Sequence, residues 1–564
     1  MTHADPAQAP EPPIARVRAA ASLIVLRDSP DGPQVLLLRR ADKPGDQNSG
    51  ATVFPGGLLD DADRGHYARC DGLDDVAASA RLGLPEHGLH YAVAAVRECF
   101  EEAGLLFAHD CGGAQLALDE RDADETTALR QALHAGRIGM DEVCERLGVR
   151  LAMGELAYFS HWITPLGMPK VFDTRFFVAR APQGQTARHD ASETVELLWL
   201  TPAQALDRGR ALKLMNVTTR TLHALAGFAT VQAALDDARA RKDIPTIRPR
   251  LATGSQGRTV VNPGDWAYAE VGRLDPTGRG HVSTELAPFR PTWISPRTLR
   301  VTAPNGSLMT GPGTNAYFVG TPGSNDWVLI DPGPDDPAHL RALREAAPGP
   351  VSRILCTHTH KDHSPAAVAL KAYFGARTLG RVADHPEWQD ASFVPDQVVS
   401  DGERIRVGDG VTLRALHTPG HASNHVCWLL EQEKLLFTGD HIMQGSTVVI
   451  NPPDGDMAVY LRSLERLLAE DLEWLAPGHG FLIERPHDEV RKTLAHRLAR
   501  EAMIVDDLRQ HGPVAEADIV SRVYAATPKA LHAMALRSLR AHLYKLRSEQ
   551  RAGVEADGRW RLVA

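Results

Sequence analysis

Histidine and aspartate side chains gather in one short segment of the 564-residue chain. The segment Thr357-His-Thr-His-Lys-Asp-His363 follows directly on an apolar, strand-like run. Because alternate residues of an extended segment point to the same side, His358 and His360 can converge on one ion. Asp362 and His363 lie beyond the predicted strand end and can reach a neighbouring ion. The spacing therefore predicts a metal site.

Three further candidate ligands follow later in the chain, each beside Gly or Pro after an apolar or β-rich run: His421, Asp440 and His479. Ligands on strand-end loops are expected at such positions. Imidazole and carboxylate ligands without thiolates suit zinc or a related divalent metal in a hydrolytic site. Seven ligands are too many for one ion. Two ions about 4 Å apart, bridged by a carboxylate and an acidified, nucleophilic water, would use them all.

Carboxylates also lie on one side of a predicted helix in the N-terminal half. Apolar residues recur there at spacings of three and four from Tyr91 to Leu106. Glu98, Glu101 and Glu102 fall at positions i, i+3 and i+4, so their carboxylates share a face. Three carboxylates on one face can bind Mg²⁺ or Mn²⁺ against a diphosphate.

Short strands and turns must position these groups. Ala20–Leu26 and Gln34–Leu38 are predicted strands joined by a turn that contains Asp, Pro and Gly. A glycine corner with Gly56 and Gly57 follows. The predicted organisation is a disordered tail (1–15), a first α/β domain (16–240), a linker rich in Pro, Gly and Arg (241–290), a second α/β domain (291–485) and a helical tail with a final strand pair (486–564).

Composition excludes several classes of protein. Hydrophobic residues make up 43% and charged residues 24%, as in globular proteins, and the net charge of -9 argues against a whole-chain polycation for nucleic acid. The longest apolar runs fall far short of about 20 residues, so no membrane span is expected. The six cysteines are scattered, and the N-terminus lacks the features of a secretory signal, so we expect a cytoplasmic protein without a disulfide framework.

The histidine segment resembles the HxHxDH motif of the metallo-β-lactamase superfamily, here His358-Thr-His360-Lys-Asp362-His363. The resemblance implies an αββα sandwich and two zinc ions, one on His358, His360 and His421 and a second on Asp362, His363 and His479, with Asp440 bridging. Asp362 and Asp440 would hold metal and water during catalysis. Asp331 resembles a supporting acidic residue of this fold, and His425 and His441 are interpreted as supporting or structural histidines.

Three segments of the tail closely resemble the β-lactamase-like protein 2 family: His496-Arg-Leu-Ala-Arg-Glu501, Ala517-Asp-Ile-Val520 and Leu531-His-Ala-Met-Ala535. That resemblance implies a winged-helix-like domain and a metal-dependent endoribonuclease that attacks a phosphodiester of single-stranded RNA. One face of the segment 529–551 is apolar and the other basic, as in a helix that contacts phosphate. Its basic residues are Lys529, Arg537, Arg540, Lys545, Arg547 and Arg551. An alternative with the same metal motif is glyoxalase II, a thioester hydrolase.

The acidic helix resembles the second half of the Nudix box, here Arg97-Glu98-Cys-Phe-Glu101-Glu102-Ala-Gly104. The first half departs from the motif: Leu89 occupies the position of the usual glutamate, and the pair Gly56-Gly57 lies about forty residues upstream of Arg97. This arrangement resembles the Nudix group of the peroxisomal coenzyme A diphosphatases, in which an insertion separates the two parts.

The Nudix resemblance implies an α/β/α sandwich that hydrolyses a nucleoside-diphosphate-linked compound such as coenzyme A. Glu98, Glu101 and Glu102 would be catalytic metal ligands, and Arg97, Gly56 and Gly57 would help to bind the ligand. Leu89 keeps a third interpretation open, a regulatory protein whose inactive Nudix half senses a nucleotide and whose tail binds RNA.

Overall fold

The computed structural model describes residues 16–44, 48–190 and 193–563, which form two compact units. The first unit comprises residues up to Leu251 together with Thr277–Arg279, and the second comprises Ala252–Pro276 and the chain from Gly280 onward. The predicted disordered tail, 1–15, lies outside the described residues. Within the described ranges, no helix is both long and apolar enough to cross a bilayer.

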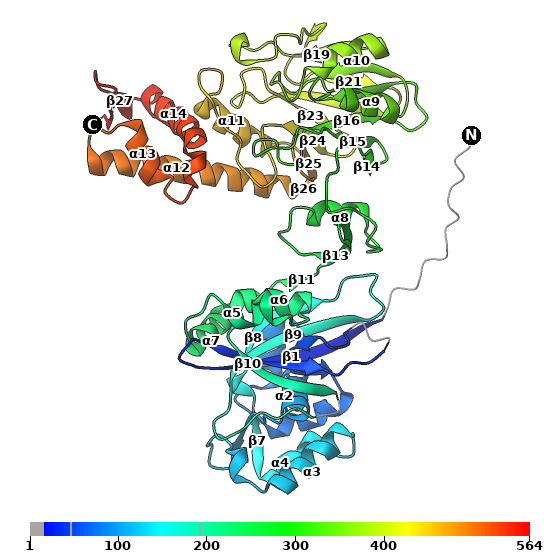
Figure 1. The fold of residues 1–564 in the computed structure, drawn as a ribbon, viewed down its shortest axis with the longest axis vertical. Coiled ribbons are helices and arrows are strands. Elements are labelled where there is room, and N and C mark those ends of the chain that lie inside the picture. The colour runs from blue at the N-terminus through cyan, green and yellow to red at the C-terminus, as the bar shows by residue number, and fades with distance from the viewer. Residues whose placement is uncertain (1–15, 45–47, 191–192, 564) are drawn as a thin grey trace. The chain divides into compact units, whose positions relative to one another are not determined.

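The first unit is built on a mixed sheet with the main strand order β10-β2-β1-β9-β8-β11 (Figure 1). Its strands are β1 (Val17–Arg27), β2 (Gln34–Arg40), β8 (Ala157–Ile163), β9 (Val171–Arg180), β10 (Thr194–Leu200) and β11 (Thr246–Ile247), with the short β3 (Thr52–Val53) and β4 (Gly56–Leu58) paired to β2 and β1. The antiparallel pair β1–β2, with Leu26 opposite Val35, is the predicted hairpin.

Alternation along β1 and β2 creates a core on each face of this sheet, because successive side chains of a strand point to opposite sides. Leu23 and Val25 join a core with helix α2 (Gly88–Ala103), whereas Ile24 and Leu26 join one with α6 (Asn216–Leu225) and α7 (Val231–Ala240). The predicted α/β/α sandwich is confirmed. Its other elements are α1 (Asp75–Leu82), α3 (Ala123–His134), α4 (Met140–Leu147), α5 (Pro202–Leu206), β5 (Cys70–Asp71), β6 (Ala108–Asp110) and β7 (Val149–Ala152).

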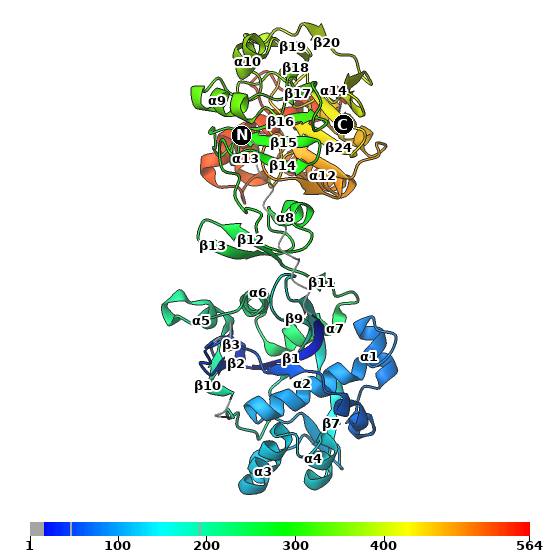
Figure 2. The same ribbon diagram turned by 90° about the vertical axis from the view of Figure 1, so that its right-hand side faces the viewer.

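The second unit contains two sheets that pack against a shared core, and Figure 2 shows the strands of the first sheet from β14 to β20. One has the order β14-β15-β16-β17-β18-β19-β20 and the other β21-β22-β23-β24-β25-β26. The first sheet comprises β14 (Thr292–Ser295), β15 (Thr298–Thr302), β16 (Asn315–Gly320), β17 (Trp327–Ile330), β18 (Val351–Leu355), β19 (Arg377–Gly380) and β20 (Gln397–Val398). The second comprises β21 (Arg404–Val407), β22 (Val411–His417), β23 (Val426–Leu430), β24 (Leu435–Gly439), β25 (Trp474–Pro477) and β26 (Ile483–Glu484).

Helices cover the outer face of each sheet in this unit. Tyr317 and Phe437, from opposite sheets, meet in the core between them. The outer face of the first sheet packs on α9 (Pro337–Ala346) and α10 (Ala366–Phe374), and that of the second on α11 (Met457–Leu467). This is the predicted αββα sandwich.

The end of the chain forms a small helical domain with its own core. It contains α12 (Pro486–His511), α13 (Glu516–Val523), α14 (His532–Ser548) and the antiparallel pair β27 (Ala552–Val554) and β28 (Trp560–Leu562). Ile504, Leu539 and Trp560 are buried together in its centre. The helices and the strand pair agree with the predicted winged-helix-like domain.

The segment 241–290, assigned above to a linker, contains regular structure. It holds β12 (Arg250–Gly254), β13 (Gly257–Val261) and α8 (Tyr268–Leu274). Glu270 of α8 is buried. It accepts two 2.7 Å hydrogen bonds from Arg300 of β15 and one hydrogen bond from the backbone of Leu482. Local periodicity gave no sign of this packing, because a partner 30 residues away stabilises a helix of only seven residues.

Candidate metal centre

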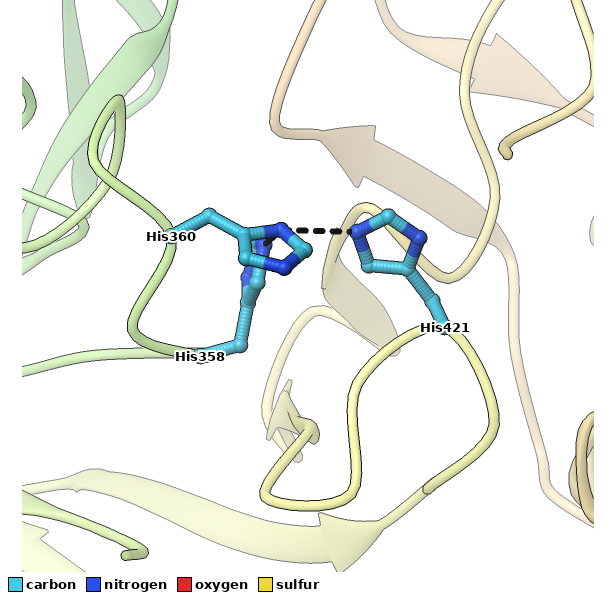
Figure 3. Close-up of side chains that lie close together, drawn as sticks. All are labelled: His358, His360 and His421. Carbon is cyan, nitrogen blue, oxygen red and sulfur yellow. Dashed lines mark hydrogen bonds between the residues drawn. The ribbon is translucent and has the colours of Figure 1, made fainter. Parts of the chain in front are cut away.

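The first ligand cluster joins residues from both sheets of the second unit. His358 and His360 follow the end of β18, and His421 follows the end of β22. Figure 3 shows the three rings turned towards one another. His360 Nδ1 lies 2.9 Å from His358 Nε2 and 3.1 Å from His421 Nε2, and the three potential ligand atoms all lie within 4.8 Å of one another.

A second cluster lies beside the first and contains Asp362, His363, Asp440 and His479. Asp440 follows β24 and His479 follows β25, so four strand ends together supply both clusters. His479 Nε2 lies 3.3 Å from Asp362 Oδ2 and 3.2 Å from Asp440 Oδ1. Asp440 Oδ2 lies 3.6 Å from His421 Nε2. Asp440 therefore faces both clusters, one oxygen towards each.

Several polar atoms of the second cluster are buried without a hydrogen-bond partner among the described residues: His363 Nε2, His479 Nε2 and Asp440 Oδ1. Buried polar atoms in folded proteins are otherwise almost always satisfied. All three converge within 4.8 Å. A donor set of imidazoles and carboxylates with inward-facing orphan atoms fits a divalent cation.

The buried carboxylates of the second cluster favour positive charge on the groups beside them. Burial lowers the pKa of His479, but Asp440 and Asp362 overcome this and raise it to about 9. Burial likewise raises the pKa of Asp440, yet His479 and His363 hold it well below its ordinary value. His358, which lies among other histidines, has its pKa lowered by burial and by His363 and His360. The carboxylates thus need cationic partners in a buried place.

The outer nitrogen of each of three histidines is held by a fixed acceptor. Asp331, the predicted supporting residue, lies 3.0 Å from His363 Nδ1 and also accepts hydrogen bonds from the backbone and hydroxyl of Thr357. His421 Nδ1 lies 2.8 Å from the carbonyl oxygen of Val449, and His479 Nδ1 lies 3.2 Å from that of Gly313. Such contacts fix the ring orientation and leave Nε2 free to face a metal.

His425 and His441 are fully buried and lie outside both clusters. The Nδ1 of His425 lies 3.0 Å from the hydroxyl of Thr418, and the His441 ring packs against Tyr460. These surroundings agree with their interpretation as supporting histidines.

A pocket of about 510 Å³ opens onto the clusters and is lined by His360, Asp362, His421 and Asp440. Its other walls are mainly apolar. They include Leu308 and Met309 from the loop before β16, Met443, Val448 and Val449 from the segment after β24, and Leu531 and Met534 from the helical domain. The sequence did not predict that the helical domain would line this pocket.

In the first unit, α2 presents the three predicted glutamates next to the glycine corner. The helix ends at Ala103, and Gly104 follows with a left-handed φ of 70°, which favours glycine. Glu102 accepts a 2.9 Å hydrogen bond from the backbone of Gly56. A Cβ on Gly57 would lie 2.3 Å from Glu98 Oε1, so the glycine allows the carboxylate to approach the backbone. Burial raises the pKa of Glu98 to about 7 and of Glu102 to about 8.

Arg97 donates to Glu98 at 2.8 Å and to Glu101 at 3.2 Å. It also forms a two-pronged ion pair with Asp63, at 2.8 and 3.1 Å. Asp63 is a site residue that the sequence motifs did not predict. Its local signal is a capping box with Asp60 at the start of a short 3-10 helix. Leu89, at the usual glutamate position, is instead a core residue.

Among the described residues, the only groups of three or more metal-ligating side chains within 4.8 Å are the two clusters in the second unit. The Nudix glutamates therefore share a helix face without converging as closely, and the guanidinium of Arg97 lies against two of them.

Family models match three parts of the chain. The metallo-beta-lactamase superfamily model covers residues 309–479, the NUDT19 Nudix domain model covers 73–215, and the beta-lactamase associated winged helix domain model covers 516–560. Each match falls within the corresponding predicted domain.

Curated relatives match the C-terminal half. A lactamase-like protein from Pestalotiopsis microspora is 32% identical over 45% of this chain and 77% of its own length. An atrochrysone carboxyl ACP thioesterase from Aspergillus chevalieri is 30% identical over 48% of this chain and 88% of its own. A beta-lactamase-like protein 2 homologue from Caenorhabditis elegans is 29% identical, over 45% and 85%. With the αββα fold and the seven clustered ligand side chains, these matches show that the chain is a hydrolase of the metallo-beta-lactamase superfamily, fused to an NUDT19-type Nudix domain and a winged helix domain.

Proposed function

We propose that the metal centre hydrolyses a thioester with an apolar acyl group. The observation that carries this proposal is the lining of the pocket. Outside the ligand cluster its walls are mainly Leu, Met and Val, and Arg537 is the only Lys or Arg among the described residues that line it. An acyl chain suits such a wall, whereas a nucleic-acid backbone is bound by several cations. The thioesterase named among the relatives supports the same reaction class.

The donor set suits two divalent cations, for which we propose zinc. His358, His360 and His421 would hold one ion. Asp362, His363 and His479 would hold the other, and Asp440 would contact both. When bound, such ions lower the pKa of a water molecule and polarise the carbonyl of the substrate. The apolar walls would seat the acyl chain, and Asp331 and the carbonyl of Val449 would keep His363 and His421 in orientation.

The chemistry of the leaving group also favours a thioester. A thiol has a pKa near 8.5, so a thiolate departs without a proton donor, whereas an alkoxide from RNA needs general acid catalysis. Apart from the proposed ligands, the acid among the lining residues is Asp454. Its carboxylate already accepts hydrogen bonds from Gln389 and Ser423.

The test is a parallel assay on full-length, zinc-loaded protein with an acyl-pantetheine, S-lactoylglutathione and single-stranded RNA. The double variant His358→Ala/His360→Ala is the control for contaminating hydrolases. We expect acyl-pantetheine cleavage that the double variant lacks. RNA cleavage lost in the control, with thioesters left intact, would refute the proposal and support the endoribonuclease.

Endoribonuclease activity is the second candidate, favoured by similarity to a beta-lactamase-like protein 2 homologue. The basic face predicted for 529–551 is, however, largely engaged within the domain. Arg540 pairs with Glu516, Lys545 and Arg551 pair with Glu501, and Arg547 stacks on Tyr544. Of the six, Lys529, Arg537 and Arg547 have no ion pair with a described residue, and Arg547 is already held against an aromatic ring. Few free cations are left for a polyanion, which weakens the case for this activity.

We propose that the Nudix half hydrolyses a nucleoside-diphosphate-linked compound such as coenzyme A, with Mg²⁺ or Mn²⁺. Support comes from Glu98 and Glu102, held against the glycine corner, and from Asp63, which gives Arg97 the carboxylate partner that Leu89 cannot supply. The alternative is a regulatory domain that binds the nucleotide without turnover.

The full-length His358→Ala/His360→Ala variant separates these alternatives, because its metallo-β-lactamase site is disabled. With coenzyme A and Mg²⁺ or Mn²⁺, we expect two phosphomonoester products by chromatography, and none from an additional Glu102→Gln change. Saturable coenzyme A binding without any product would support the regulatory alternative.

A further inference from the structure

The helical domain contributes one wall of the active-site pocket through a single helix face. Leu531, Met534 and Arg537 recur at spacings of three across the start of α14, and all three line the pocket. Leu308 and Met309, two strongly exposed apolar side chains of the β15–β16 loop, line the same pocket. Exposed large apolar residues beside a cavity mark a surface that binds an apolar group.

Arg537 is an isolated cation in this surface. It makes no hydrogen bond or ion pair with any described residue, whereas Arg540, three positions further along α14, donates to Glu516 at 2.8 Å. The other charged lining residues are the carboxylates Asp362, Asp440 and Asp454. Outside the metal clusters, an anionic group in the pocket would therefore meet one complementary side chain, and guanidinium is well suited to carboxylate or phosphate.

From this arrangement we infer that Arg537 binds an anionic group of the thioester, placed at the far end of an apolar stretch that rests on Leu531 and Met534. The inference rests on the proposed thioesterase function and names its substrate class as anionic thioesters. The anion has two possible sources with shared chemistry: a phosphate on the arm of the carrier thiol, or a carboxylate at the end of the acyl group.

The experiment measures binding and hydrolysis with two matched pairs of thioesters. The first pair is butyryl-4′-phosphopantetheine and butyryl-pantetheine, and the second is glutaryl-pantetheine and valeryl-pantetheine. None carries the nucleotide diphosphate that the Nudix half would bind. Affinities are measured by calorimetry on the His358→Ala/His360→Ala variant, which cannot turn the thioester over, and kcat/KM on the zinc-loaded, otherwise native full chain.

We expect the native Arg537 protein to prefer the anionic member of one pair by at least tenfold, in affinity and in kcat/KM. Arg537→Ala should abolish that preference, Arg537→Lys should retain part of it, and Arg540→Ala, the matched control on the same helix, should leave it intact. Preference within the first pair identifies the carrier phosphate, and preference within the second identifies the acyl carboxylate.

Equal affinities within both pairs, or a preference that Arg537→Ala leaves unchanged, would overturn the inference. Failure of the proposed function is separately visible. If no thioester is hydrolysed but the anionic member still binds through Arg537, the binding site stands and the thioesterase proposal falls.

Discussion

Asp63 accepts two hydrogen bonds from Arg97, which lies 34 residues further along the chain. The carboxylate is almost fully buried, and the same guanidinium also contacts Glu98 and Glu101. The segment between the glycine corner and α2 thus supplies a carboxylate partner for Arg97 that is not part of the Nudix motif. Arg97 is thereby fixed in orientation beside the glutamates that we propose as metal ligands.

Replacing Asp63 by alanine should destabilise the Nudix unit by about 1–3 kcal/mol, because a mostly buried guanidinium loses its two-pronged partner. Coenzyme A hydrolysis should fall with it. Leu89→Glu should not compensate, since position 89 lies in the apolar core and a carboxylate there would be buried without a partner. Urea unfolding and chromatographic product analysis of both variants check this. Restored activity in the double variant would contradict it.

Gly57→Ala should lower coenzyme A hydrolysis at least tenfold with little loss of stability. The new Cβ would overlap the end of the Glu98 side chain, which can move away but then no longer faces the glycine corner. Gly65→Ala is the matched control, because a Cβ there meets no atom within 4 Å. Rates are compared with thioester hydrolysis by the same preparation. Equal Nudix rates for the two variants would show that Glu98 needs no close approach to position 57.

Arg497→Ala should weaken zinc binding in the first cluster by about tenfold. Arg497, on α12, is buried and donates to the carbonyl of Val448, and the next carbonyl, of Val449, is the acceptor that orients His421. Arg500→Ala is the control, since Arg500 stacks on Tyr524 within the helical domain instead. Competition with a zinc chelator measures the difference. Identical zinc affinities for the two variants would mean that the Val448–Val449 segment keeps its place unaided.

Glu501 should make the helical domain lose stability in acid. Burial opposes ionisation, but hydrogen bonds from His542 and Lys545 lower the pKa of Glu501 to about 2. Because the pKa of Glu501 is lower in the folded than in the unfolded protein, where it is about 4.3, the ionised carboxylate stabilises the fold. This contribution to the free energy of unfolding, on the order of 3 kcal/mol, is complete above about pH 4.3 and is lost as the pH falls towards 2. Unfolding of Glu501→Gln followed from pH 6 to pH 2.5 should show a flatter acid limb than the native protein.

The control for this measurement is Glu549→Gln, since Glu549 pairs with Lys545 and Arg551 from a much more exposed position. Its acid limb should match that of the native protein. If Glu501→Gln keeps the native slope, another carboxylate governs the acid sensitivity.

Local sequence was enough to predict elements whose determinants lie close together in the chain. The β1–β2 hairpin follows from two apolar runs around a turn, and the shared face of Glu98, Glu101 and Glu102 follows from the helical period. The spacing of His358, His360, Asp362 and His363 likewise predicted four ligands at one strand end, because residues this close in sequence must also lie close in space.

Tertiary structure decided the relationships between distant segments. His421 joins the cluster of His358, and Asp440 joins that of His363, because β22 and β24 end at the same place as β18 of the other sheet. Sheet packing is not encoded in any local period. For the same reason, three further relationships could not be predicted from the sequence: the pairing of Asp63 with Arg97, the pairing of Glu270 with Arg300, and the place of Arg537 in the active-site pocket. Residue types and short spacings determined the chemistry available to this chain, whereas long-range packing decided which side chains meet to perform it.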